Sequence, residues 1–172
     1  MKGNLIMTPE NAQAFERSIE MLDSSIQEMR RVAHNMMPEV LVKFGLDAAL
    51  KDFCIGISQT GALNVQYQSL KMEGADIDQT TSITLYRVVQ ELVHNALKHA
   101  SAKNVIVQIS RTEGGLTLEV EDDGIGFDTE ILRATDGIGW TNIRNRIEFL
   151  KGKLDVSSQT GKGTSVHIEL DI

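Results

Sequence analysis

Residues 90–100 read Gln-Glu-Leu-Val-His-Asn-Ala-Leu-Lys-His-Ala, and this stretch decides how the rest of the chain is interpreted. The spacing predicts a helix on which Glu91, Asn95 and Lys98 share one face, because they stand at i, i+4 and i+7. The opposite face is apolar and predicted to enter a core through Leu85, Val89, Leu92, Val93 and Ala96. The polar face combines a carboxylate, an amide oxygen and a cation. Such a face is suited to a nucleotide held through a metal ion.

Three glycine clusters follow this helix: Asp122-Asp-Gly-Ile-Gly126, Gly137-Ile-Gly139 and Gly161-Lys-Gly-Thr164. Glycine lets the backbone approach a ligand closely, and backbone N–H groups in such turns can bind phosphates. Asp122 ends a predicted strand, where its carboxylate can accept a hydrogen bond from an adenine amino group. Taken alone, each feature also has a structural interpretation, as a solvated helix face or a turn. Their fixed order favours a nucleotide site.

Composition narrows the function classes. The formal net charge of −7 over 172 residues argues against a nucleic-acid-binding surface. The single cysteine, Cys54, excludes an internal disulfide, fits a reducing compartment and is predicted to be a small buried hydrophobe. The four histidines lack zinc-ligand spacing with Cys54. No apolar run approaches the roughly 20 residues of a membrane-spanning helix, so we expect a cytoplasmic chain whose membrane anchor, if any, lies upstream.

Hydrophobic periodicity predicts an α+β fold. A helix is expected over about 46–57, a strand over 63–70, the helix with the opening motif over 80–100, and a further helix ending at Lys151-Gly152. Alternating apolar residues predict a hairpin that turns at Gly114-Gly115 and two final strands that turn at residues 161–163. Residues 127–139 show no period and are predicted to be a mobile loop. The expected architecture is a mostly antiparallel sheet with helices on one face.

A heptad pattern precedes this domain. Apolar residues recur at spacings of 4 and 3 up to Pro38, at Phe15, Ile19, Leu22, Ile26, Met29, Ala33 and Met36. The pattern favours a helix that self-associates in a bundle, although an amphipathic helix lying on its own domain remains an alternative. We therefore divide the chain into residues 1–38 and residues 39–172, and expect a homodimer through the first segment.

The motifs resemble a known family. Gln90-Glu91, Asn95 and Lys98-His99-Ala100 resemble the N box of the ATP-binding domain of bacterial sensor histidine kinases. The superfamily of that domain also includes DNA gyrase B, heat-shock chaperone ATPases and mismatch-repair ATPases. The three glycine clusters resemble its glycine boxes in the same order, and the likeness covers about residues 41–170.

The resemblance implies the two-layer α/β sandwich of that superfamily, with ATP and Mg²⁺ as cofactors. It implies Mg²⁺ binding by Asn95, adenine binding by Asp122, and catalytic roles near the phosphates for Glu91, Lys98 and His99. It also implies that residues 127–139 form the ATP lid. The implied pocket lining consists of Gly124, Gly126, Gly137, Gly139, Gly161, Gly163 and Thr164.

Residues 28–41 and 45–50 narrow the resemblance to the nitrate-sensor and desaturase-regulator type of kinase, in which such a segment joins the dimerisation helix to the catalytic domain. In that family the phosphorylated histidine lies on an earlier helix, in a setting that no histidine here shares. His34 belongs to the downstream segment. The resemblance thus implies a fragment that contains the second dimerisation helix and the ATP domain, with its acceptor histidine elsewhere and inactive in autophosphorylation by itself.

The leading interpretation is the catalytic part of a two-component kinase, whose phosphoryl group passes to an aspartate of a response regulator. Two alternatives stay open. One is a hydrolytic ATPase of the same superfamily, with Glu91 activating water; the other is a non-catalytic nucleotide-binding or dimerisation module.

Overall fold

The computed structural model describes residues 15, 18–19, 38–130 and 138–171. The chain divides into two units, Met1–Pro38 and Glu39–Ile172. In the first unit Phe15, Ser18 and Ile19 are helical and exposed. The remaining heptad positions lie outside the described residues, so the dimerisation helix stays a prediction.

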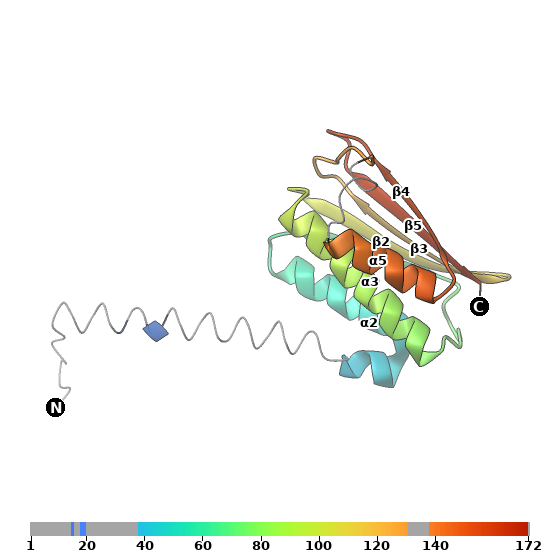
Figure 1. The fold of residues 1–172 in the computed structure, drawn as a ribbon. Coiled ribbons are helices and arrows are strands. Elements are labelled where there is room, and N and C mark those ends of the chain that lie inside the picture. Colours follow the sequence, from blue (N-terminus) through green and yellow to red (C-terminus); the bar gives the residue numbers. More distant parts are fainter. Residues whose placement is uncertain (1–14, 16–17, 20–37, 131–137, 172) are drawn as a thin grey trace, which may run out of the picture. The chain divides into compact units, whose positions relative to one another are not determined.

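The second unit contains one five-stranded sheet with the spatial order β1-β2-β3-β5-β4 (Figure 1). β1 pairs with β2 in parallel, and the other neighbours pair antiparallel. The predicted hairpin is present, since β2 and β3 are joined at Gly114-Gly115. The strands are β1 Asn64–Leu70, β2 Asn104–Thr112, β3 Gly115–Asp122, β4 Lys153–Ser158 and β5 Thr164–Asp171.

Helices α2 (Glu39–Gln59), α3 (Gln79–Lys98) and α5 (Ile138–Phe149) cover one face of the sheet (Figure 1). The predicted α+β sandwich is therefore confirmed. α2 starts earlier than the sequence suggested and is interrupted at Gly45, whose φ of 81° lies in the left-handed region. α5 also starts earlier, so Ile138 and Gly139 belong to a helix and the loop prediction for these two residues was wrong. The other described residues of the predicted loop, 127–130, form no helix or strand.

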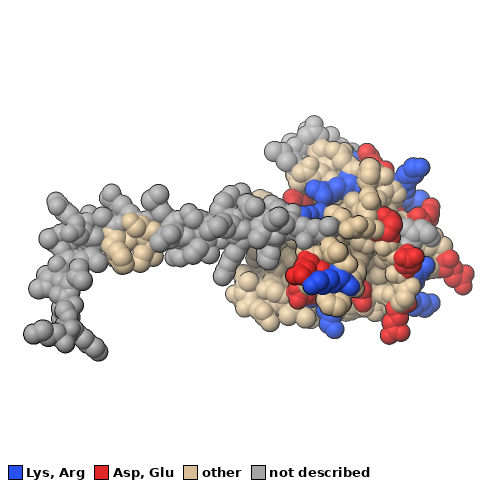
Figure 2. Space-filling view, turned by 90° about the horizontal axis from the view of Figure 1, so that it is seen from below, with Lys and Arg blue, Asp and Glu red and all other residues tan. Residues whose placement is uncertain are grey.

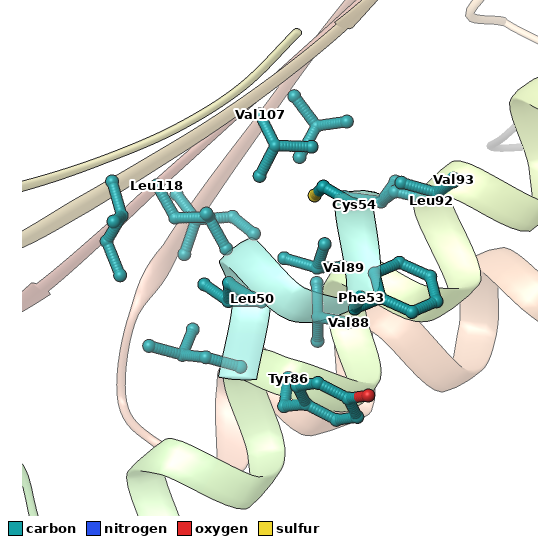
Figure 3. Close-up of a cluster of buried hydrophobic side chains, with 14 of the residues drawn as sticks. Leu50, Phe53, Cys54, Tyr86, Val88, Val89, Leu92, Val93, Val107 and Leu118 are labelled. Carbon is teal, nitrogen blue, oxygen red and sulfur yellow. The ribbon is translucent and has the colours of Figure 1, made fainter. Parts of the chain in front are cut away.

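The core lies between the helices and the sheet (Figure 3). Inward residues of α3 meet those of α2 and of the central strands, as the apolar face of the opening motif required. Cys54 is fully buried there, and burial raises the pKa of its thiol to about 12, so it is a core residue. The labelled residues of the cluster are Leu50, Phe53, Cys54, Tyr86, Val88, Val89, Leu92, Val93, Val107 and Leu118.

Charges are distributed without a single dominant sign on the face that Figure 2 shows, where acidic and basic side chains are interspersed. None of the helices in the described part of the chain combines the length and the apolar character that crossing a membrane requires.

Candidate functional site

The polar face of α3 meets the first turn of α5. A Cβ at Gly139 would lie 2.7 Å from Oε1 of Glu91 and 3.7 Å from Oδ1 of Asn95. Glycine at this position therefore leaves room beside both side chains. Glu91 and Asn95 thus lie beside Gly139, although these residues are more than 40 positions apart in sequence.

Asn95 has an unusual environment. Its Nδ2 atom is buried and has no hydrogen-bond partner among the described residues. An unpaired buried polar atom costs about 1–3 kcal/mol. Nδ2 is a hydrogen-bond donor, so an acceptor atom of a bound molecule would satisfy it.

Asp122 lies at the end of β3 and accepts a hydrogen bond from the backbone N–H of Gly124 at 2.8 Å. Thr164 stands opposite it on β5, and both its backbone and its side chain hydrogen-bond to the carboxyl group. Partial burial is the largest influence and raises the pKa of Asp122 above its usual value, while these hydrogen bonds oppose the rise. The result is a half-buried acceptor held in a fixed orientation.

Close backbone contacts join the first and third glycine clusters to the end of α3. A Cβ at Gly124 would collide with Ala100, and one at Gly163 would collide with the backbone oxygen of Asp122. The turn is closed by the backbone N–H of Ile125, which donates to the backbone oxygen of Ala100 at 2.8 Å. A Cβ at Gly126 would collide with the backbone of residue 159. The clusters thus converge on one end of the sheet.

The other predicted site residues make fewer contacts with the residues described above. Lys98 and His99 are exposed at the end of α3, where the backbone N–H of His99 donates to the backbone oxygen of Asn95 at 2.9 Å and ends the helix. Gly161 has a φ of 83° but open space around its Cβ position, so the turn and not a close neighbour requires glycine. Gly137 lies outside the described residues.

Sequence reasoning missed Ser158, the last residue of β4. Its hydroxyl contacts the backbone of Phe127 and of Gly163 and the side chain of Thr164. Its position three residues before the third glycine cluster was the available signal. A serine beside a turn is common, however, and its partners are not visible in sequence.

Two further features lie outside this constellation. A cavity lined by Asp76, Ile77, Asp78, Thr81, Leu150, Leu170 and Asp171 sits at the opposite end of α3. In the described part of the chain, no three His, Cys, Asp or Glu side chains gather in a way that would hold a metal ion.

Comparison with known proteins identifies the family of this chain. Residues 80–172 match the family described as histidine kinase-, DNA gyrase B-, and HSP90-like ATPase. Sensor histidine kinase ComP of Bacillus subtilis is 28% identical over 156 residues, which are 89% of this chain and 20% of ComP. Sensor histidine kinase MctS of Rhizobium johnstonii is 29% identical over 149 residues, 86% of this chain and 32% of MctS. The chain thus spans between a fifth and a third of these curated relatives.

Solved structures agree. The histidine kinase domain of the blue-light activated histidine kinase of Erythrobacter litoralis matches with a TM-score of 0.60 and 27% identity, covering 73% of this chain and 60% of that one. Histidine kinase AdeS of Acinetobacter baumannii matches with a TM-score of 0.58 over 98% of this chain and 87% of that one, but at 17% identity it shows the fold alone. The chain belongs to the family of histidine kinase-, DNA gyrase B- and HSP90-like ATPases, and within it to the catalytic region of bacterial sensor histidine kinases.

Proposed function

We propose that this chain binds Mg·ATP and transfers the γ-phosphoryl group to a histidine outside these 172 residues, for relay to an aspartate of a response regulator. The observation that carries the proposal is Asn95, whose buried Nδ2 has no hydrogen-bond partner among the described residues and which lies with Glu91 on the face of α3 beside Gly139 of α5.

Asp122 forms the adenine end of the proposed site. Its carboxylate is held by the Gly124 N–H and by Thr164, which leaves acceptor capacity for an adenine amino group. Gly124, Gly126 and Gly163 allow the close backbone contacts that hold the loop around this carboxylate together.

Asn95 and Glu91 form the phosphate end. The amide oxygen of Asn95 is a suitable single ligand for Mg²⁺, which usually takes its other ligands from phosphates and water. The metal would supply charge neutralisation at the phosphates. In this proposal Glu91, which lies beside Gly139, accepts a hydrogen bond from a bound water or from the phosphoryl-accepting group, and the exposed Lys98 and His99 meet the phosphate charge. The remaining glycines, Gly137 and Gly161, belong to the proposed phosphate-facing turns.

The chain's own contribution to catalysis is positioning and electrostatics. We include in the proposal a homodimer through the N-terminal heptad helix, a receiver domain as partner, a cytoplasmic location and the nitrate-sensor and desaturase-regulator subfamily. The hydrolytic ATPase remains the second candidate because Glu91 stands beside the amide at the phosphate end.

Calorimetry tests the nucleotide assignment. The unsubstituted chain should bind ATP more tightly with Mg²⁺ than with EDTA, and Asn95→Ala should remove this Mg²⁺-dependent gain. Asn145→Ala, at an exposed position of α5, is the matched control and should bind as the unsubstituted chain does. Equal Mg²⁺ dependence in Asn95→Ala and Asn145→Ala would refute the assignment of Asn95.

Phosphate release separates the two enzymatic candidates. A kinase fragment should release little phosphate, whereas an ATPase should turn over steadily and lose that turnover in Glu91→Gln. Steady, Glu91-dependent release would replace the kinase proposal by the ATPase.

A further inference from the structure

Ser158 sits where the first and third glycine clusters meet. It ends β4 and pairs in register with Thr164 of β5. Its side chain is half-buried, whereas the neighbouring Ser157 points to the other face of the sheet and is exposed. The two adjacent serines therefore have different surroundings.

The Ser158 hydroxyl makes three polar contacts. The backbone N–H of Phe127 donates to Oγ of Ser158 at 2.9 Å. Oγ of Ser158 lies 3.0 Å from the backbone oxygen of Gly163, to which it donates, and 3.0 Å from Oγ1 of Thr164, where either hydroxyl can be the donor. A serine hydroxyl has one proton and two lone pairs, so three contacts use all of its capacity. An alanine at this position would replace none of them.

Each contact leads to a different part of the site. Thr164 hydrogen-bonds to Asp122, the proposed adenine acceptor. Gly163 packs against the backbone of Asp122. Phe127 directly follows the first glycine cluster, and its ring lies 5.8 Å from that of Trp140, centroid to centroid, one residue after Gly139. One side chain therefore contacts the backbone of Phe127, the backbone of Gly163 and the side chain of Thr164, and the Phe127–Trp140 ring pair extends these contacts toward the second cluster.

We propose that Ser158 is a positioning residue of the nucleotide site. It holds Thr164 and Gly163 against Asp122, and it holds Phe127 against Trp140, without itself contacting the nucleotide. This inference rests on the proposed function for its effect on ATP. Its effect on Phe127 can be measured without ATP.

The chain offers a direct optical readout, because Trp140 is its only tryptophan. Ser158→Ala should change Trp140 emission in nucleotide-free protein and weaken ATP binding about five- to tenfold, as expected for the loss of a hydrogen-bonded hydroxyl. Ser157→Ala should change neither. Ser158→Thr, which keeps the hydroxyl, should recover at least part of both. Each variant is measured at a temperature below its thermal unfolding transition. If Ser158→Ala does not fold, it is replaced by Ser158→Cys, whose thiol is a weak hydrogen-bond donor.

A merely structural role would give a different pattern. If Ser158→Ala lowers the melting temperature but leaves Trp140 emission and ATP affinity as in Ser157→Ala, the positioning role is overturned. If the unsubstituted chain binds no ATP, the proposed function fails. In that case a change of Trp140 emission confined to the Ser158 variants still supports the link to Phe127, and its absence overturns that link too.

Discussion

At the scale of single residues, the site is built from close approaches that only glycine permits, but these approaches differ in what they face. At Gly163 the obstacle is the backbone of Asp122, and φ is 81°. At Gly139 it is the end of the Glu91 side chain, which can rotate away. The first contact holds the fold together, and the second shapes the space beside Asn95. Substitution should separate these two roles.

Gly163→Ala should destabilise the domain by more than about 2 kcal/mol, because the new Cβ meets backbone and the left-handed conformation is strained. Gly139→Ala should remain folded while weakening ATP binding, since Glu91 must move. Gly56→Ala, in α2 with open space around it, is the control and should stabilise by about 0.5–1 kcal/mol. Urea unfolding and calorimetry measure both effects. Equal stability of the Gly163 and Gly56 variants would contradict the backbone argument.

Asp122 predicts a pH dependence of adenine binding. An adenine amino donor stabilises the charged carboxylate, so affinity is full above the pKa of the free protein and falls as pH drops through it. Because burial raises that pKa, the fall should begin at a higher pH than for an ordinary carboxyl group. Adenosine affinity can be measured at a series of pH values by NMR titration. Adenosine is used because it carries no phosphate. The Asp122→Asn variant should bind adenosine weakly, and its affinity should not fall as the pH drops. An equal fall of affinity in Asp122→Asn would show that another group causes the pH dependence.

At the scale of elements, α3 connects the stability of the domain to the site. Its N-terminus is capped by Asp78, which accepts from the backbone N–H of Thr81 at 3.0 Å. Its C-terminal half carries Glu91 and Asn95. The cap and the site occupy opposite ends of the helix, so a change at the cap tests the helix without touching the nucleotide groups.

Asp78→Ala should cost about 1 kcal/mol of unfolding free energy through loss of the cap. Hydrogen bonds from Thr81 lower the pKa of Asp78, so its contribution is present above the unfolded-state pKa and disappears as pH falls through the folded-state value. The difference between Asp78→Ala and the unsubstituted chain should therefore shrink in acid. Asp76→Ala, exposed and outside the cap, is the control in thermal unfolding. A constant difference down to about pH 2.5 would contradict the cap assignment.

At the scale of the whole molecule, the sequence predicted the layers and the order of the boxes, because period and glycine placement are local properties. It did not predict the parallel pairing of β1 with β2, since alternation at Val65 and Tyr67 carries no direction. The break at Gly45 was equally hidden. The network around Ser158 joins segments 31 residues apart, and no local pattern encodes such a contact. Those parts of the site depend on tertiary packing.

The positions of the histidines in the whole molecule bear on whether this chain can phosphorylate itself. Phosphoryl transfer needs an acceptor nitrogen about 3–3.5 Å from the γ-phosphorus, in line with the leaving oxygen. His167 alternates with the buried residues Val166 and Ile168 on β5 and so lies on the sheet face away from the core, and Nδ1 of His94 lies 3.2 Å from the backbone oxygen of Gln90. His99 is one of the groups that we propose bind the phosphate charge, and the proposed acceptor is a histidine outside these residues. On this proposal the chain alone, given Mg²⁺ and γ-labelled ATP, should form no acid-labile phosphohistidine even where calorimetry shows nucleotide bound. His34→Gln should behave identically. Label that appears on the unsubstituted chain and disappears in His34→Gln would make His34 the acceptor and place the whole transfer within these residues.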